Sequence, residues 1–228
     1  MDSEEVRRIR MAYAERDRTR KSINRNPGRQ RMLRERNDTM QRVLGQRLER
    51  PLSECRILDV GCGIGSLLSW FNERGVPPGN LFGIDLSPDR IKIARESHPA
   101  FTFIEGNAER LAFPDGWFDL VLVFTVFSSI LDDAMARNVA RSIGRVLKKS
   151  GVVVWHDMRY PNPCNSAVRA MTKSRIRKLF PSFELELERI YLLPPIAYHL
   201  GRFTDWAYPI LASSPVLRSH YFGLLWPL

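Results

Sequence analysis

The sequence predicts an α/β fold in which a sheet of seven strands carries helices on both faces. Apolar runs typical of buried strands alternate with amphipathic stretches typical of helices through most of the 228 residues. The first run ends near Asp59 and is followed by glycines at alternate positions, Gly61, Gly63 and Gly65. The second ends at Asp85. A strand that turns through glycines into a helix, followed by a strand ending in an acid, is typical of a Rossmann-like sheet.

The periodicity places each element in order. Strands are expected at residues 56–60, 80–84, 101–104, 118–124, 151–156, 183–193 and 219–226. Helices are expected at 66–74, at 88–97 behind the Ser87-Pro88 cap, from Asp132 or Asp133 to Lys148, and at 166–179. Because strands and helices alternate up to residue 156, the first five strands should be parallel. The last two are expected to form an antiparallel pair at the sheet edge.

Residues 1–50 are expected to form basic helices, broken at 26–28, that append to a domain of residues 51–228. This segment holds 15 Lys and Arg against 8 Asp and Glu, and so carries most of the net charge of +10. Such charge could attract RNA, anionic lipid or a phosphorylated substrate. However, Tyr13 is the only aromatic residue there, so platforms for stacking bases are missing. Leu33, Met40, Leu44 and Leu48 share one helical face, which favours a helix docked on the core with a solvated basic side.

The glycine loop has the features of a nucleotide-type cofactor site. Glycine lets the backbone turn sharply and lets a ligand lie against it. A dinucleotide fingerprint would place a sixth-position glycine where Ser66 stands. Asp85 lies twenty positions beyond Gly65, where an acid can accept hydrogen bonds from both ribose hydroxyls.

The pattern Asp59-x-Gly61-x-Gly63-x-Gly65 resembles motif I of the class I S-adenosylmethionine-dependent methyltransferases. About residues 55–160 follow the motif order of that family, and residues 103–121 resemble the acidic segment of its type 11 or ubiquinone-biosynthesis-like group. The resemblance implies a Rossmann-like seven-stranded methyltransferase sheet and S-adenosyl-L-methionine as the cofactor. Asn107 stands where the family usually has Asp, but its side-chain oxygen still offers an acceptor for the adenine amine.

The resemblance also assigns cofactor contacts by position. These are Asp59, Gly61, Cys62, Gly63 and Gly65 around the methionine end, Asp85 and Leu86 at the ribose, Asn107, Ala108 and Glu109 at the adenine, and Phe124 through its backbone. An N-terminal lid is common in this group, so Tyr13 and Arg16 could close over the methionine carboxylate. Alternatively, Tyr13 is an aromatic residue that packs between helices.

Methyl transfer from a sulfonium mainly requires alignment and the exclusion of water. A hydroxyl acceptor would also need a base, for which His156 and then Asp157 are the first candidates, with Asp132 or Asp133 as alternatives. Each has a plainer interpretation, as a strand-end histidine bonded to a loop or as an acid at a helix N-terminus. No spacing of ligands supports a metal, so none is predicted.

Acceptor selection is expected in residues 194–218, an aromatic-rich insertion between the last two strands. The candidate acceptor residues are Tyr198, His199, Arg202, Phe203 and Trp206. They could line a pocket or a shallow lipid-facing surface, or they could simply cover the sheet edge.

The expected function is therefore O-methylation of a small molecule, sugar or glycolipid in a bacterial biosynthetic pathway. RNA methylation is an alternative, although residues 124–129 do not resemble an Asn-Pro-Pro-Tyr amine-methylation motif. A catalytically silent cofactor-binding partner protein is another, but the intact glycine loop argues against it. Without a signal-like leader or an apolar run of 18 residues, a cytoplasmic location is expected.

Overall fold

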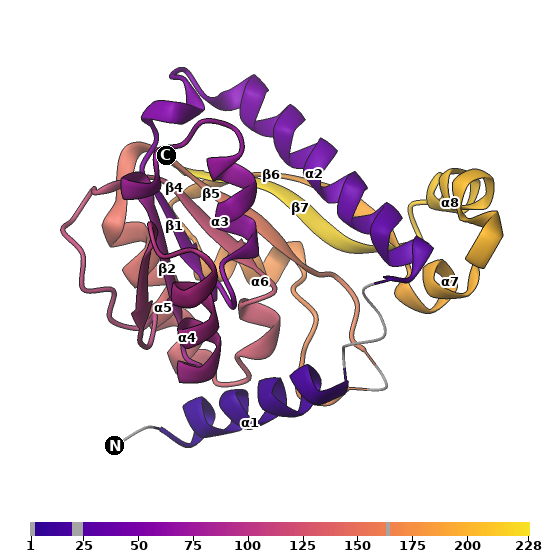
Figure 1. Cartoon of the computed structure of the whole chain (residues 1–228), viewed down its shortest axis with the longest axis horizontal. Helices are drawn as coiled ribbons and strands as arrows, with labels where there is room; N and C mark the ends of the chain where they lie inside the picture. The colour runs from indigo at the N-terminus through magenta and orange to yellow at the C-terminus, as the bar shows by residue number, and fades with distance from the viewer. Residues whose placement is uncertain (1–2, 20–24, 163–164) are drawn as a thin grey trace.

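A seven-stranded sheet runs through the middle of the molecule (Figure 1). The computed structural model describes residues 3–19, 25–162 and 165–228. The strand order is β3-β2-β1-β4-β5-β7-β6. The strands are β1 (Ile57–Val60), β2 (Leu81–Asp85), β3 (Thr102–Glu105), β4 (Phe118–Phe124), β5 (Leu147–Met158), β6 (Phe183–Leu192) and β7 (Arg218–Pro227).

Strand pairing confirms the predicted fold class. The strands β1 to β5 pair in parallel, and β7 runs antiparallel to both β5 and β6. The last strand of the chain thus lies inside the sheet, and β6 forms the edge. Because β6 is antiparallel to β7, it ends at the same side of the sheet as β5.

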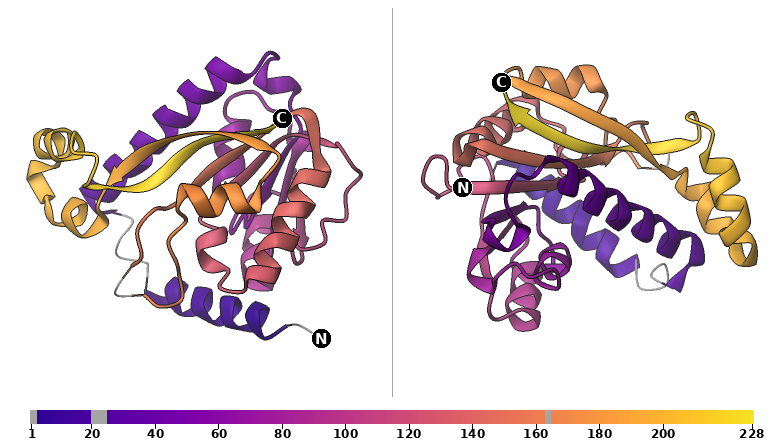
Figure 2. Two further views of the ribbon diagram at one scale, coloured as in Figure 1. Left: turned by 180° about the vertical axis from the view of Figure 1, so that it is seen from behind. Right: turned by 90° about the horizontal axis from the view of Figure 1, so that it is seen from above.

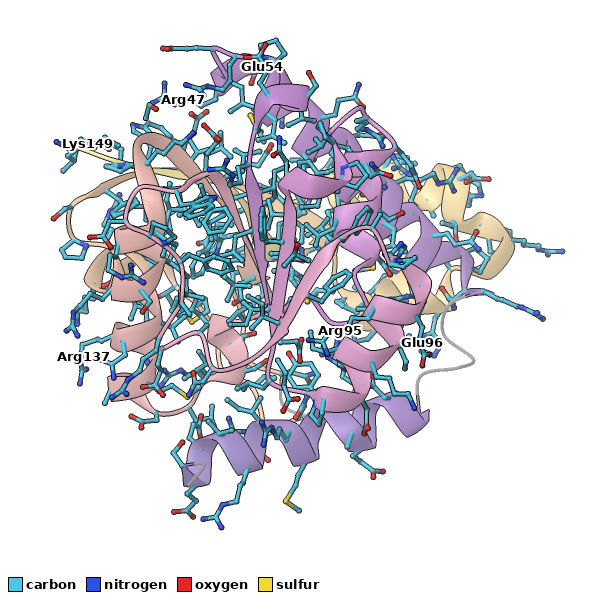
Figure 3. All side chains as sticks on the ribbon, turned by 60° about the vertical axis from the view of Figure 1, so that its left-hand side comes forward. Arg47, Glu54, Arg95, Glu96, Arg137 and Lys149 are labelled. Atoms are coloured by element: carbon cyan, nitrogen blue, oxygen red, sulfur yellow. The ribbon has the colours of Figure 1, made fainter. Side chains whose placement is uncertain are left out.

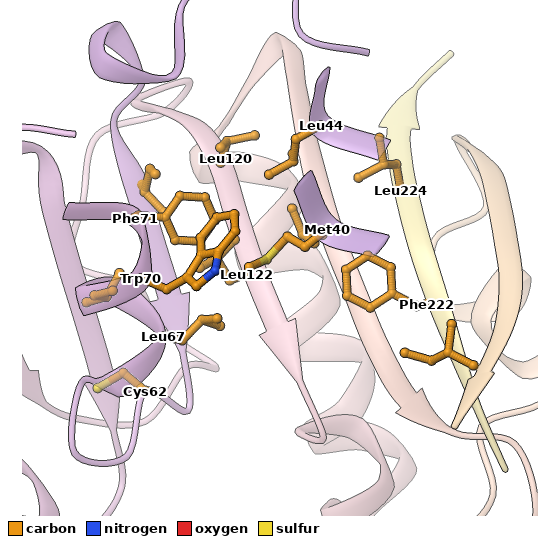
Figure 4. Close-up of a cluster of buried hydrophobic side chains, with 14 of the residues drawn as sticks. Met40, Leu44, Cys62, Leu67, Trp70, Phe71, Leu120, Leu122, Phe222 and Leu224 are labelled. Carbon is orange, nitrogen blue, oxygen red and sulfur yellow. The ribbon is translucent and has the colours of Figure 1, made fainter. Parts of the chain in front are cut away.

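Helices cover both faces of the sheet (Figure 2). They are α1 (Glu4–Thr19), α2 (Pro27–Arg47), α3 (Ser66–Asn72), α4 (Pro88–Ser97), α5 (Asp133–Val146), α6 (Lys173–Leu179), α7 (Pro194–His199) and α8 (Thr204–Ala212). On one face, α2 and α3 bury Met40, Leu44 and Phe71 against Leu122 and Phe222 of the sheet (Figure 4). On the other face, α5 and α6 bury a second apolar cluster. None of the described helices combines the length and the apolar character that a membrane crossing requires.

The break between the first two helices lies at the predicted position. Asn26 caps α2 by accepting a hydrogen bond from the Arg29 amide at 3.2 Å, and Pro27 occupies the first turn, where its missing N–H costs nothing. The predicted apolar face is slightly misplaced, because Met32 is buried while Leu33 is only half-buried. Charged side chains such as Arg47, Glu54, Arg137 and Lys149 lie on the outside of the molecule (Figure 3).

The helix predicted at 166–179 is wrong in its first half, since α6 begins only at Lys173. Before it, the Arg169 amide donates to the Ser128 carbonyl at 2.8 Å, and the Met171 amide donates to the Met158 carbonyl at 2.7 Å. These amides bond to distant segments and so do not join a helix. Thr172 then caps α6 by accepting from the Arg175 amide.

Candidate functional site

A cavity of about 180 Å³ lies at the carboxyl ends of β1, β2 and β4, beneath α1. Strand order reverses between β1 and β4 at this point, which is where open α/β sheets bind ligands. Six of the predicted cofactor residues line the cavity: Gly61, Asp85, Leu86, Asn107, Ala108 and Phe124. Five others lie outside its lining: Asp59, Cys62, Gly63, Gly65 and Glu109.

The glycine loop adopts a conformation that other residues reach only with strain. Gly61, Gly63 and Gly65 have φ angles of 73°, 56° and 83°, in the left-handed region. A Cβ atom on Gly61 would approach Val126 to 3.0 Å, and one on Gly65 would approach the Phe103 ring to 2.7 Å. The loop therefore needs glycine both for its turn and for the close approach of its backbone to the cavity wall.

Asp85 ties the loop to β2. Its carboxylate accepts hydrogen bonds from the Gly63 amide at 2.9 Å and from the Ser87 amide at 2.8 Å. These bonds orient the carboxylate while it lines the cavity. Asp59 is buried nearby, and its pKa is raised well above the usual range by burial and by the charge of Asp85, against a lowering effect of Arg36.

Asn107 and Glu109 differ in where they point. The Asn107 oxygen accepts from the Glu109 amide at 3.0 Å, so its bonding capacity is only partly free for a ligand. The Glu109 carboxylate accepts from Asn107 at 2.8 Å and from Asn138 of α5 at 2.9 Å. The structure thus turns Glu109 toward α5 and leaves Asn107 and Ala108 at the cavity.

The helix α1 covers the cavity with Ile9, Arg10, Tyr13 and Arg16. The Tyr13 hydroxyl lies 2.9 Å from Ser129 Oγ, and the Arg10 Nε donates to the Leu86 carbonyl at 2.7 Å. Sequence reasoning missed Ile9 and Arg10, although Val6, Ile9 and Tyr13 stand at helical spacing.

Two further contacts hold α1 in place. Glu5 accepts from the Leu131 amide at 2.5 Å and from Arg8 at 2.7 Å, and these partners lower its pKa to about 2. At the other end, Asp17 accepts two bonds from Arg90 of α4 at 2.7 and 2.8 Å. Arg90 also lines the cavity and was missed from the sequence.

The predicted bases His156 and Asp157 lie on opposite faces of the sheet, because successive residues of a strand alternate in direction. Asp157 is fully buried and accepts from the Ser128 amide at 3.0 Å and from the Met158 amide at 2.8 Å. Burial raises its pKa to about 6. These bonds give Asp157 a structural role, in holding the short turn Phe127–Ser129. The alternatives Asp132 and Asp133 lie at the N-terminus of α5, where Asp132 caps the helix.

His156 lies on the α2 face within a group of aromatic rings. Its ring centroid is 5.0 Å from those of Tyr191 and His220 and 5.2 Å from that of Phe124. Neither ring nitrogen has a hydrogen-bond partner among the described residues. Burial lowers the pKa of His156 well below its usual value, with a smaller effect from His220, so the imidazole is neutral at pH 7.

The predicted acceptor residues lie in α7, α8 and the turn between them, at the end of the molecule where β6 finishes (Figure 1). None of the five lines the cavity. Asn26 donates to the Tyr198 carbonyl at 2.9 Å, which joins α7 to the start of α2. His199 Nδ1 lies 2.6 Å from the Pro195 carbonyl. Phe203 and Trp206 are 46% and 62% exposed and meet edge to face.

Comparisons with known proteins agree with this geometry. Residues 57–151 match a family model described as a methyltransferase domain. The phthiotriol/phenolphthiotriol dimycocerosates methyltransferase of Mycobacterium leprae is 32% identical over 130 residues, which cover 56% of this chain and 47% of that protein. The fatty-acid O-methyltransferase of Mycolicibacterium smegmatis is 38% identical over 109 residues, covering 46% and 37%. The chain thus matches about half the length of these curated relatives, or less.

A solved structure shows the same fold. The S-adenosylmethionine-dependent methyltransferase from Mesorhizobium loti aligns with a TM-score of 0.61 at 19% identity, covering 80% of this chain and 94% of that one.

Proposed function

Because this chain belongs to the class I S-adenosylmethionine-dependent methyltransferases of the type 11 group, we propose that it methylates an oxygen of a small-molecule or lipid-linked acceptor. The main supporting observation is that Gly61 of the glycine loop and Asp85 line one cavity at the switch point of the sheet. S-adenosylmethionine, the cofactor of this family, supplies a methyl group already activated on a positively charged sulfur. The protein must therefore align the acceptor and exclude water.

The residues present fit this cofactor. Gly61 lines the cavity without a side chain, so its backbone is open to a ligand there. Asp85 presents an oriented, buried carboxylate of the kind that accepts bonds from ribose hydroxyls. We assign Asn107 and Ala108 to the adenine, the loop and Asp59 to the methionine end, and α1 to a lid that shields the reaction from water.

The names of the relatives favour an oxygen acceptor with a large apolar part, since one is a fatty-acid O-methyltransferase and another acts on dimycocerosates. The exposed aromatic side chains of Phe203 and Trp206 suit such an acceptor. We therefore retain residues 194–218 as the acceptor-side segment, with Tyr198, His199 and Arg202 beside the two aromatics.

The test is transfer of a radiolabelled methyl group into cell extract separated into lipid, small-molecule, protein and nucleic-acid fractions. Label in the lipid or small-molecule fraction supports the proposal. Label in RNA would instead identify an RNA methyltransferase, and cofactor binding without any transfer would identify a silent partner protein.

Asp85→Ala is the cofactor-site variant for this test. It should weaken binding of S-adenosylhomocysteine by at least about tenfold, the effect of losing a charged hydrogen-bond acceptor, and should abolish transfer. Asp89→Ala, at an exposed position of α4, is the matched control and should leave both unchanged. Calorimetry measures the affinity and thermal unfolding verifies the fold. Equal effects of both variants would contradict the assignment.

A further inference from the structure

A group of arginine and aromatic side chains lies beside the cavity on the α2 face of the sheet, and the Arg29 Nε and both ring nitrogens of His156 within it lack a hydrogen-bond partner among the described residues. We call it the Arg36 cluster, and it consists of Arg29, Arg36, Phe124, His156, Tyr191 and His220. Phe124 joins it to the cavity, because Phe124 lines the cavity while the Arg36 guanidinium carbon lies 5.9 Å from its ring centroid.

Among the described residues, the two arginines have no carboxylate at ion-pair distance, although the charge of Arg36 lowers the pKa of the buried Asp59. They stand seven positions apart, two turns along the same side of α2. Neither forms an ion pair with any Asp or Glu in the described part of the chain, whereas Arg42 of the same helix pairs with Glu188. Arg36 bonds only to the neutral Asn37 oxygen, at 2.8 and 3.1 Å, and the Arg29 Nε is buried without a partner. Both side chains are only partly buried, and a guanidinium group without a carboxylate partner can bind an anion.

His156 is a neutral member of the cluster. Two carboxyl groups lie near the cluster: Asp59, whose pKa the charge of Arg36 lowers, and Glu35, which accepts from the Tyr191 amide at 3.3 Å and pairs with Arg218. His156 is 5% exposed, and both of its ring nitrogens lack a partner among the described residues. A neutral imidazole offers one hydrogen-bond donor and one acceptor, so it can orient a ligand without adding charge. Tyr191 and His220 pack against it at 5.0 Å each. Asp157 is on the far face, with both of its oxygens bonded to amides.

Backbone strain marks the same place. In the described part of the chain, only Thr125 and Tyr191 have positive φ angles without being glycine, at 56° and 64°. Thr125 follows Phe124 directly, and Tyr191 contacts His156. The left-handed turn at Tyr191 puts its side chain in the same apolar cluster as its neighbours Ile190 and Leu192. Strain of this kind concentrates at sites where ligands are bound.

We infer that the acceptor is an apolar carboxylic acid, bound as its carboxylate by Arg36 and Arg29. This inference rests on the proposed methyl transfer and names its substrate class. A carboxylate oxygen forms the new bond to the methyl carbon, the carbon–sulfur bond breaks, and its electron pair returns to sulfur. The products are a neutral methyl ester and a neutral thioether, so charge balances and no proton has to be removed.

Two features favour a carboxylate. It arrives already ionised, so a site with cations and a neutral histidine needs no base. A guanidinium group matches a carboxylate through paired hydrogen bonds. The methyl ester has lost the charge that these bonds require, which weakens its hold and favours release of the product.

Calorimetry on protein saturated with S-adenosylhomocysteine tests the inference without turnover. The probes are dodecanoate and dodecanol, which share a chain and differ in charge. Dodecanoate should bind at least about tenfold more tightly than dodecanol, and Arg36→Gln should remove that preference while affinity for S-adenosylhomocysteine stays unchanged. Arg34→Gln, exposed on the same helix, is the control and should keep the preference. Arg36→Lys provides a second variant, which should retain part of the preference for dodecanoate because lysine keeps the positive charge.

Three results would overturn the inference: equal binding of acid and alcohol, no binding of dodecanoate, or a loss of S-adenosylhomocysteine affinity in Arg36→Gln. The last would place Arg36 at the methionine carboxylate of the cofactor instead. Failure of the proposed function would give a different result. Dodecanoate would still bind through Arg36, but no labelled methyl ester would form when S-adenosylmethionine is supplied.

Discussion

Asp157 shows how the position of a residue along a strand decides which face of the sheet its side chain reaches. It follows His156 directly, yet it points to the opposite face and bonds to the amides of Ser128 and Met158. Its carboxyl group is fully buried, which favours the neutral form and raises its pKa to about 6 from an ordinary 3.8. A carboxyl group that binds its proton more tightly in the folded state links stability to pH.

The sign of this linkage gives a prediction at the residue scale. The contribution of Asp157 is fully present below pH 3.8 and is lost as pH rises through 6, by up to about 3 kcal/mol. Asn at this position does not titrate. Chemical denaturation of wild type and Asp157→Asn should therefore show wild type losing free energy of unfolding relative to the variant between pH 4 and 6. Parallel pH profiles would contradict the buried, titrating carboxyl group.

At the scale of elements, α2 is the helix that joins the sheet to the α7–α8 segment. Met40 and Leu44 pack on the sheet, while its first turn meets α7. A Cβ atom on Gly28 would lie 1.9 Å from the Ala197 carbonyl oxygen, whereas one on Gly45 would meet nothing within 4 Å. Close packing against α7 therefore requires glycine at position 28, whereas no contact requires it at position 45.

These two glycines form a matched pair for mutation. Gly28→Ala should lower the free energy of unfolding by about 1–3 kcal/mol, because α7 must shift from α2 to admit the methyl group. Gly45→Ala should raise the free energy of unfolding by up to about 1 kcal/mol, because alanine favours the helix and the added methyl group would contact no other residue. Denaturant titration of both variants measures this. Stabilisation by Gly28→Ala would disprove the close packing of α2 on α7.

At the scale of the whole molecule, the parts that differ most from a plain Rossmann-like sheet lie near its carboxyl ends. The helix α1 covers the cavity proposed for the cofactor, and α7 and α8 extend from the end of β6 (Figure 1). Trp206 is 62% exposed, more than its large apolar ring would favour in water. An acceptor with an apolar part would gain from contact with it.

Trp206→Ala and Phe203→Ala should therefore reduce kcat/KM for the acceptor several-fold while leaving the Kd of S-adenosylhomocysteine unchanged. Both side chains are exposed, so thermal stability should change little. Ile93→Ala, at a 45% exposed position on α4, controls for loss of an apolar surface side chain. If acceptor use and cofactor affinity fell equally, residues 194–218 would not be the acceptor-side segment.

Local sequence was sufficient to predict the strand, glycine loop, helix and strand of the proposed cofactor site. Asp59, the three glycines and Asp85 lie within 27 residues, and their order dictates strand, turn, helix and strand. The left-handed φ angles of the loop follow from glycine itself. Apolar runs, and alternation at residues 183–193, likewise predicted all seven strands, because burial imposes such patterns on each segment separately.

Other features depended on contacts between distant segments, which no local pattern records. The predicted helix start near residue 166 failed because the amides of Arg169 and Met171 bond to carbonyls elsewhere in the chain. Glu109 turned toward Asn138, and strand alternation separated His156 from Asp157.

The sequence by itself determined the fold class, the glycine loop and the acid of β2, because each arises from residues close together along the chain. Only the tertiary structure decided that Arg36, Phe124, His156 and Tyr191 meet. They come from one helix and three strands, and packing α2 on the sheet brings them together. The proposed cofactor recognition is thus local in sequence, whereas the proposed acceptor recognition depends on the packed fold.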